Sequence, residues 1–351
     1  MTELTNVKKE DLVVHILNVG HGDAIIIELP RNAQGKRVLG IVDCYKKTKT
    51  WEYLNKLKTA RNNTIERVDF VCATHPHYDH IAGIESLLKE LAGSQDWGKP
   101  NEFWDSGFRH NSKTYKDILT TVHDEGISMR RISSGMEWYY GTVRVTALSP
   151  SVMLRNRYAT YGVDMNNASI VLRLENCEDD AVTVQSKRYQ GTTDPDVVRE
   201  AGNSVVLLGG DAEFDSWARI SQEYPCLTAS DKHEPLVTKM VNLLNCAVVK
   251  VAHHGSMHSS PLEVYERMTP SIAVVSNKQK ASGQFSLGGT QQPRNLFPHG
   301  LTEIALEEVG ATILTTEQEG TVVVAVSPGG NIRHKCMGDN ADTPPTPPPE
   351  Q

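Results

Sequence analysis

"THPHYDH", residues 74–80, places three histidines and an aspartate within six positions, directly after an apolar run of strand length. A tight loop after such a strand points the alternate residues His75 and His77 to one side. Asp79 and His80, at the start of the next helix, then point to an adjacent position. Imidazole and carboxylate groups are ligands of zinc or manganese, and two neighbouring half-sites suit a pair of ions about 3.5–4 Å apart. The stretch therefore predicts a dinuclear metal site at the end of a buried strand.

Two later segments place metal-competent side chains at the same point relative to a strand. "VVLLGGDAE" ends an apolar run on Asp211, where a carboxylate can bridge two ions, and "VVKVAHHGSMHSS" ends another on His253 and His254. Open α/β sheets hold their sites at the carboxyl ends of strands, so these residues are expected to meet the first group. An ordinary explanation stays open for each motif: His77 and His80 as solvated loop residues, and Asp211 as a turn residue or helix cap.

The pattern of apolar runs predicts one large α/β domain over residues 1–337. Runs of strand length such as "LVVHILNV", "AIIIEL", "SIVLRLE" and "SIAVVS" alternate with segments of helical periodicity such as "IAGIESLLKELAG". Two sheets, or one large mixed sheet, covered by helices would explain this order. We interpret a polar, weakly periodic stretch at 177–203 as an insertion, and the proline-rich end at 338–351 as a disordered tail.

Composition excludes several classes of protein. The net charge of −7 does not fit a basic protein that wraps nucleic acid, although it is compatible with a local basic patch. No window holds the ~18 consecutive apolar residues needed to cross a bilayer. The amino-terminal residues lack the apolar core of a signal peptide, so we expect a cytoplasmic protein without membrane contact. The six cysteines are scattered without a C-x-x-C pair, which indicates buried thiols. Oligomeric state leaves no readable pattern.

The sequence resembles the metallo-β-lactamase fold superfamily, whose His-x-His-x-Asp-His signature is matched without a gap by residues 75–80. Within that superfamily it looks like the branch that includes the hydrolase domain of the competence protein ComEC. Besides the metal motif, the segments that carry this likeness are "LNVGHGDAIIIEL", "IVDC", "NNASIVLRL", "LLGGD" and "VAHHGSMHSS". The resemblance extends to about Lys335. It implies a four-layer αββα sandwich with a dinuclear centre at one edge of its two sheets.

The resemblance also implies a role for each candidate ligand. It assigns His75 and His77 to the first ion, Asp79 and His80 to the second, and Asp211 to a bridging position, with His253 or His254 completing the second site. Asp43 matches an early aspartate that supports the ligand loop from behind. Asp23 is retained in "NVGHGD", where Asn18 and His21 replace the aspartate and glutamine usual in the branch. His21 is explained by a tight turn as well as by a function.

One ligand of the first ion departs from the superfamily pattern. Most members place a further histidine between the main motif and the bridging aspartate, but here only His110 and His123 lie there, and neither ends an apolar strand. Asn166 or Asn167 occupies the matching position, as in the ComEC-like branch, and Asn167 is taken as the candidate ligand. Because an asparagine amide is a neutral, weak ligand, the first ion is expected to bind less tightly.

Two divalent ions would lower the pKa of a shared water from about 16 to near 7, which provides a hydroxide nucleophile at neutral pH. Asp79 or Asp211 would orient that nucleophile. Ser256 has no Gly-x-Ser-x-Gly context, so it is a candidate for binding substrate and not for attacking it. By resemblance to late histidines in phosphodiesterase members, His299 in "NLFPHG" would donate a proton to the leaving group or bind a phosphate. A lone loop histidine is otherwise usually solvated.

A phosphodiester fits best as substrate, because paired ions bind one non-bridging oxygen and the leaving oxygen together. The segment after the early aspartate holds six basic side chains against one acidic one, and its candidates for binding substrate are Lys46, Lys47 and Lys49. Trp51 and Tyr53 lie among them, as in surfaces that hold backbone phosphates and stack bases. The alternative is an ordinary solvated helix face.

The leading hypothesis is a metal-dependent nuclease or phosphodiesterase that acts on DNA, RNA or a cyclic nucleotide. The chain lacks the membrane channel that accompanies the competence protein, so DNA uptake is not expected. An effector in an antiviral defence system, with a partner protein from the same multi-gene system, is a hypothetical setting. Two other classes stay open: a hydrolase of a small ester, thioester or lactam, and a degenerate binding module that keeps the fold and has lost turnover.

Overall fold

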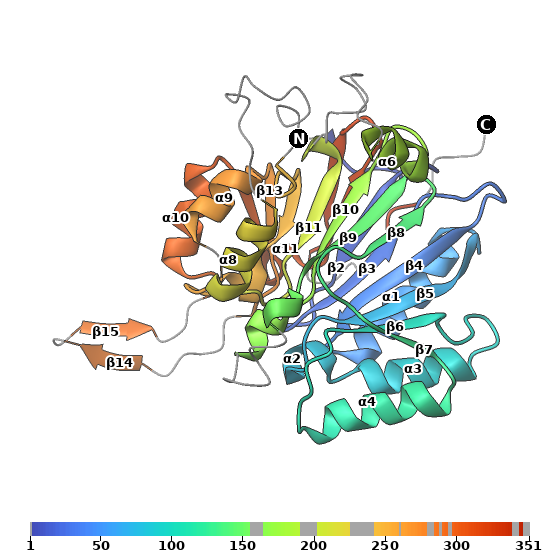
Figure 1. Ribbon diagram of the computed structural model, residues 1–351, viewed down its shortest axis with the longest axis horizontal. Helices are drawn as coiled ribbons and strands as arrows, with labels where there is room; N and C mark the ends of the chain where they lie inside the picture. The colour runs from blue at the N-terminus through green and yellow to red at the C-terminus, as the bar shows by residue number, and fades with distance from the viewer. Residues whose placement is uncertain are drawn as a thin grey trace.

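Two large β-sheets pack face to face, and helices cover both outer faces (Figure 1). The computed structural model describes residues 2–154, 164–189, 202–224, 242–259, 261–278, 284–287, 290–293, 297–338 and 344–346. A sheet that is apolar on both faces must be covered on both, and this arrangement does so with one sheet on the inner side and helices on the outer side. The α/β sandwich expected from the sequence is confirmed.

The first sheet has nine strands and carries the metal motif. Its strands, in spatial order, are β1 (Thr2–Glu3), β18 (Ile332–Cys336), β17 (Val322–Val326), β2 (Leu12–Ile16), β3 (Ala24–Glu28), β4 (Arg37–Cys44), β5 (Ile65–Ala73), β6 (Glu102–Asp105) and β7 (Ser128–Arg131). The run from β4 to β7 is parallel, so the carboxyl ends of these strands lie at the same edge.

The second sheet has seven strands. In spatial order they are β16 (Thr312–Thr315), β13 (Ile272–Val275), β12 (Val248–Lys250), β11 (Val205–Leu208), β10 (Val171–Asn176), β9 (Val143–Ser149) and β8 (Glu137–Tyr140). Here β11, β12, β13 and β16 are parallel neighbours, so their carboxyl ends also share one edge. A separate hairpin pairs β14 (Gln284–Leu287) with β15 (Thr290–Pro293).

Helices lie on both sides of this pair of sheets (Figure 1). The outer face of the first sheet is covered by α1 (Lys47–Ala60), α3 (Ile84–Gly93) and α4 (Lys113–Asp124). The outer face of the second is covered by α8 (Phe214–Glu223), α9 (Leu262–Met268) and α10 (Gly300–Glu308). The short elements are α2 (Tyr78–Ile81), α6 (Ala181–Tyr189), α11 (Thr316–Glu319), η1 (Met165–Ala168), η2 (Gly202–Ser204) and η4 (Ala252–Gly255).

Strand β3 shows why the strands of the first sheet are apolar on both faces. Ile25 and Ile27 belong to the core between the two sheets, whereas Ile26 belongs to the core under the helices. Successive side chains point to opposite faces of a strand, so both sets must be apolar. Helix α3 packs against this outer core with buried residues three or four positions apart, among them Ile84, Leu87 and Leu91.

A buried ion-pair network lies beneath the helical layer. The Glu28 carboxylate is 2.6 Å from the Nε of Arg61, 3.0 Å from the Nε of Arg37 and 3.3 Å from the Nε2 of His15, and all four side chains are buried. Burial alone would raise the pKa of Glu28, but the two guanidinium groups outweigh it and hold this pKa well below its ordinary value. Arg61 therefore supports the fold and is not part of a basic surface.

Two segments singled out in the sequence are described in part. The stretch 177–203 contains α6, whose Ala181 and Val184 pack in a small cluster with Cys177, while residues 190–201 lie outside the described part. In the proline-rich end, Pro344 and Pro345 are buried, and the N–H of Val7 donates to the carbonyl of Thr346 at 3.1 Å. The buried Arg61 guanidinium also donates to the carbonyl of Pro345, and the disorder expected for 338–351 stays a prediction.

The sequence predicted buried thiols and no segment that crosses a membrane. Cys44, Cys72, Cys177, Cys246 and Cys336 are all free thiols, and the first four are buried. Desolvation raises the pKa of Cys44 to about 12, so this thiol is inert at neutral pH. Among the described residues, none of the helices has the length and apolar character needed to span a bilayer.

Candidate metal centre

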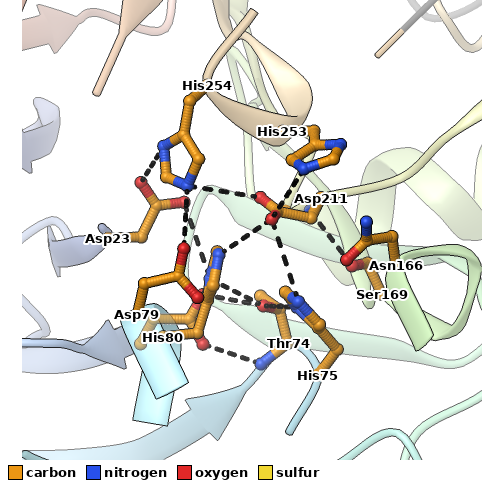
Figure 2. Close-up of polar contacts among 12 residues, drawn as sticks. Asp23, Thr74, His75, Asp79, His80, Asn166, Ser169, Asp211, His253 and His254 are labelled. Carbon is orange, nitrogen blue, oxygen red and sulfur yellow. Dashed lines mark hydrogen bonds and ion pairs between the residues drawn. The ribbon is translucent and has the colours of Figure 1, made fainter. Parts of the chain in front are cut away.

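Loops from both sheets converge at one edge of the sandwich (Figure 2). His75 follows β5, and His80 lies in α2 immediately after it. Asp211 follows β11, and His254 lies in η4, which follows β12. The four side chains thus follow three strands, β5, β11 and β12, that are far apart in the chain. The convergence expected from the strand pattern is therefore present.

Asp211 lies at the middle of the cluster. Its Oδ2 is 3.1 Å from the Nε2 of His80 and 3.8 Å from the Nε2 of His75, and its Oδ1 is 3.9 Å from the Nε2 of His254. The backbone N–H of Asp211 donates to the Oγ of Ser169 at 3.0 Å, which fixes the loop. A carboxylate placed between imidazoles on two sides suits the bridging position that the resemblance implies.

The structure distinguishes between the two consecutive histidines. His254 is buried, and its Nδ1 donates to the carbonyl of Ser276 at 2.7 Å, so its Nε2 faces Asp211 and the Oδ2 of Asp79, which is 3.6 Å away. His253 is 24% exposed, and its Nδ1 is 2.8 Å from the Oε1 of Glu213. His254 is therefore the better placed ligand. Both residues have left-handed φ angles, 45° and 53°, which an L-residue adopts only under strain.

Unpaired buried atoms test whether a metal fits this cluster. Among the described residues, the Nε2 atoms of His75, His80 and His254 and the Oδ1 of Asp211 are buried without a hydrogen-bond partner. Buried polar atoms without partners are costly in folded proteins and need an explanation. Three imidazole nitrogens and a carboxylate that converge are a donor set typical of zinc or manganese. The residues fit a divalent cation.

Asp43 supports His80 from behind, as the resemblance implies. Its Oδ2 accepts a hydrogen bond from the Nδ1 of His80 at 2.7 Å, and its two oxygens accept from the N–H and hydroxyl of Thr74 at 2.8 and 2.7 Å. Burial alone would lower the pKa of His80, but the Asp211 and Asp43 carboxylates outweigh it and raise this pKa well above its ordinary value. The site favours a positive charge beside these carboxylates.

Lys250 is a residue of this edge that sequence reasoning missed. Its side chain is fully buried, and its ammonium group forms an ion pair with the Oδ2 of Asp23. Asp23 in turn lies 3.8 Å from the Nδ1 of His80 and 4.0 Å from the Nδ1 of His254. The pair joins the end of β12 in the second sheet to the start of β3 in the first. A lysine inside the apolar run "VVKVA" is the signal that could have revealed it.

The remaining candidates for the first ion are less closely grouped. The ring of His77, which is partly exposed, lies 4.6 Å from that of His75 and 6.4 Å from that of His110, measured between centroids. Asn167 uses its Oδ1 to accept from the N–H of Ser216 at 2.9 Å.

Asn166 is better placed than its neighbour to complete the first site. It donates through its Nδ2 to the Oε1 of Glu213 at 3.0 Å, while its Oδ1 is buried without a hydrogen-bond partner among the described residues. Asn166 is therefore favoured over Asn167. The full burial of His80 contradicts its interpretation as a solvated loop residue.

His21, for which the sequence left a role in a tight turn equally open, lies close to the candidate metal ligands. One ligand atom of His21 lies within 4.8 Å of those of Asp79 and His254. Its ring is 4.4 Å from that of His254 and 4.8 Å from that of Phe297. His21 therefore borders the side of the cluster that the resemblance assigns to a second ion.

A cleft of about 1100 Å³ opens beside Asp79 and His21. Its basic lining residues are Lys46, Lys47, Lys49 and Lys278. Lys47 pairs with Glu90 at 2.5 Å, and Lys49 donates to the carbonyl of Asn18 at 2.8 Å, whereas the Nζ of Lys46 lies 4.0 Å from the ring centroid of Tyr45. Lys46, Lys47 and Lys49 belong to the basic segment noted in the sequence, whereas Lys278 follows β13; the four lysines are called the basic wall of the cleft.

The aromatic residues assigned to that segment are placed differently from the expectation. Tyr53 is buried, with its hydroxyl 2.9 Å from the Nδ1 of His15, and Trp51 packs against the core of the first sheet. Both residues lie on the side of α1 that packs against the sheet, whereas the sequence predicted that they lie on a nucleic-acid-binding surface. The exposed aromatic residue in the cleft is Tyr78, which is 67% exposed and lies beside Tyr45.

Ser256 and His299 lie next to each other on the second sheet's side. The N–H of His299 donates to the carbonyl of Gly255 at 2.7 Å, and its Nδ1 accepts from the N–H of Leu301 at 3.3 Å as the cap of α10. Ser256 accepts at its carbonyl from the hydroxyl of Thr302 at 3.1 Å. These contacts join the start of α10, including His299, to Gly255 and Ser256, which directly follow His254.

Comparison with known proteins agrees with the fold. The sequence model of the Metallo-beta-lactamase superfamily matches residues 44–147. ComE operon protein 3 of Bacillus subtilis (strain 168) is 22% identical over 258 residues, which cover 74% of this chain but 24% of that protein. The chain thus spans about a quarter of the length of this relative.

Two solved structures are distantly similar to this chain. A long form of RNase Z from yeast has a TM-score of 0.43 at 9% identity, over 92% of this chain and 42% of that chain. A diphosphatase from the PhnP family has a TM-score of 0.38 at 11% identity, over 76% of this chain and 86% of that chain. Such distant likenesses do not bear on the site. The sequence match, the sandwich of two sheets and the intact His-x-His-x-Asp-His motif confirm the resemblance seen in the sequence: the chain is similar to the Metallo-beta-lactamase superfamily over residues 44–147 and weakly similar to ComE operon protein 3.

Proposed function

We propose that this protein is a metal-dependent hydrolase that cleaves phosphodiester bonds of nucleic acid, with two zinc or manganese ions. The observation that carries the proposal is the buried cluster of His75, His80, His254 and Asp211, which opens beside a cleft lined by lysines. A basic wall favours a phosphate over a neutral ester or lactam, because anionic substrates gain from nearby cations. The same wall is compatible with DNA, RNA or a smaller nucleotide.

The chain's own residues would divide the work. When bound, the ions supply a nucleophile by lowering the pKa of water to near 7 and stabilise negative charge on phosphate oxygens. Burial alone would raise the pKa of Asp79, but the His254 and His80 imidazoles outweigh it and hold this pKa well below its ordinary value. Asp79 is therefore expected to be an anion at neutral pH, where it can orient a water and accept its hydrogen bond. His299, whose backbone N–H donates to the carbonyl of Gly255 next to His254, is proposed to approach the leaving oxygen.

The cleft supports a nucleic-acid substrate in a second way. Tyr78 exposes its ring beside the metal motif, and base stacking on an exposed aromatic ring stabilises bound single strands by about 1–3 kcal/mol per base. Tyr45 lies 6.2 Å away between ring centroids, with Lys46 over its face. Cation and ring side by side suit a phosphate and a base of the same chain.

The first expected result is phosphodiester turnover that needs metal. Protein loaded with Zn²⁺ or Mn²⁺ is expected to cleave single-stranded DNA, RNA and bis(p-nitrophenyl) phosphate, and to leave a p-nitrophenyl ester largely intact. The chelated protein is expected to be inactive because it lacks the ions, and the Asp79→Ala variant because it lacks one of the candidate ligands. Turnover of the ester without turnover of any phosphodiester would contradict the proposal.

The basic wall predicts a salt-dependent contribution to binding. Replacing Lys46 and Lys278 with alanine is expected to weaken binding of single-stranded DNA and to make the slope of log K against log salt less negative by about 0.7 for each phosphate that is no longer neutralised. Fluorescence anisotropy over a salt series measures both quantities. The matched control is the pair Lys36→Ala and Lys89→Ala, which removes equal charge from exposed positions outside the cleft. Equal slopes for the two double variants would exclude the cleft from binding.

A further inference from the structure

A second basic cavity lies at the same edge of the first sheet and has no part in the site described so far. Its volume is about 540 Å³, and it is formed by the ends of β6 and β7 and the start of α4. Three exposed cationic side chains line it: Arg109, Lys116 and Arg131. Lys116 donates to the neutral Oδ1 of Asn111 at 2.6 Å, so its charge is not cancelled by this contact. Asp105 is the acidic lining residue, and its carboxylate is buried and accepts from the N–H of Gly107.

This cavity adjoins the metal centre through two histidines. His110 lines the cavity, and its ring centroid is 6.4 Å from that of His77, which is 4.6 Å from that of His75. The Nδ1 of His110 is buried and has no hydrogen-bond partner among the described residues. A ligand in this cavity would therefore lie next to the first ion's side of the centre. The lysine-lined cleft lies on the other side, next to Asp79 and His21.

The strand order fixes the arrangement of the three features along the edge. The cleft is bordered by the loop after β2 and by the end of β4, the metal motif follows β5, and the second cavity follows β6 and β7. Neighbouring strands are about 4.8 Å apart, so the edge from β2 to β7 is roughly 24 Å long. Several consecutive nucleotides would be needed to follow it. The metal centre lies inside this stretch and not at its end.

We infer that the substrate is a single polynucleotide strand that binds on both sides of the metal centre and is cleaved internally. The inference rests on the proposed function and narrows it. Backbone phosphates on one side of the scissile bond would contact Lys46 and Lys278, and those on the other side would contact Lys116 and Arg131. Each event adds one water across one P–O bond, and the fragments leave with a phosphomonoester and a hydroxyl end. A cyclic mononucleotide or dinucleotide would use only one of the two basic surfaces.

Circular single-stranded DNA tests internal cleavage directly. The metal-loaded protein is expected to convert the circle to linear product and then to shorter fragments, at a rate within a fewfold of that for the linear strand of the same sequence. A circle that stays intact while the linear strand is degraded from an end would overturn the inference and leave the proposed function standing. A protein that cleaves none of these and not even bis(p-nitrophenyl) phosphate would refute the proposed function instead.

Charge reversal tests the second cavity independently of turnover. The Lys116→Glu/Arg131→Glu variant is expected to bind a 20-nucleotide single strand at least ~10-fold more weakly than the wild-type protein at low salt, measured by anisotropy on metal-loaded protein held with a non-hydrolysable phosphorothioate strand. Its matched control is Lys36→Glu/Lys89→Glu, which makes the same change in net charge elsewhere. The loss should shrink to about twofold for a dinucleotide, which is too short to reach the cavity. Identical affinities of the two variants for the long strand would exclude the cavity from substrate binding.

Discussion

Asp211→Asn is expected to lose both metal ions at stoichiometric metal concentration and to reduce phosphodiester turnover by about 10³-fold or more, as loss of an essential catalytic group does in other enzymes. The reason is geometric: Asp211 is the one carboxylate whose oxygens, among the residues that the structure describes, lie within 4.0 Å of nitrogens from His75, His80 and His254 at once. An amide removes the negative charge and one oxygen donor while keeping the shape. Elemental analysis of the purified protein measures the loss of metal, and the phosphodiester assay measures the loss of turnover.

A matched control separates metal binding from overall charge. Asp215 is exposed in the first turn of α8, only four residues further along, so Asp215→Asn changes the net charge equally. That variant is expected to keep both ions. Full metal content and wild-type turnover in Asp211→Asn would show that the cluster is not the metal site.

Glu28→Gln is expected to lower the free energy of unfolding by about 3–5 kcal/mol, because it leaves the buried Arg37 and Arg61 without their counter-ion. Urea unfolding measures this loss. The control is the ion pair between the partly exposed Lys47 and the exposed Glu90, and Glu90→Gln is expected to cost less than about 1 kcal/mol. Similar losses for the two variants would show that the buried network contributes no more than a surface ion pair.

The same network predicts a pH dependence with a definite sign. The pKa of Glu28 is held well below its ordinary value of 4.5 in the folded protein, so the unfolded chain binds this proton more readily. The stabilisation is therefore present at pH values above about 4.5 and is lost as the pH falls below that value towards the folded pKa. In Glu28→Gln this part of the acid sensitivity should be absent.

The local parts of the site could be predicted from sequence, because each is a short motif that follows an apolar strand. His75, His80 and Asp211 lie where "THPHYDH" and "VVLLGGD" end their strands, and parallel strands bring such ends to a common edge. The choice between His253 and His254 could not be predicted. It depends on the carbonyl of Ser276, which belongs to a different loop.

The role of a charged side chain was harder to predict where it depends on whether that side chain is buried. Arg61 and Lys46 lie in the same basic segment, yet Arg61 is buried against Glu28 and Lys46 borders the cleft. The difference arises because Arg61 caps the end of α1, where it turns toward the sheet. Lys250 was missed for the same reason, since its partner Asp23 comes from the other sheet and is 227 positions away in the chain.

Because the donor atoms come from loops of both sheets, bound cations would cross-link the two sheets of the sandwich. Occupancy would then be coupled to conformational stability, with about 1.4 kcal/mol gained for each tenfold rise of free ion above its dissociation constant. When transition metal is scarce, the two sheets would separate more readily at this edge. The apolar layer between them would then be exposed to proteases. Cellular abundance of the protein would thus follow metal supply even when no substrate is present.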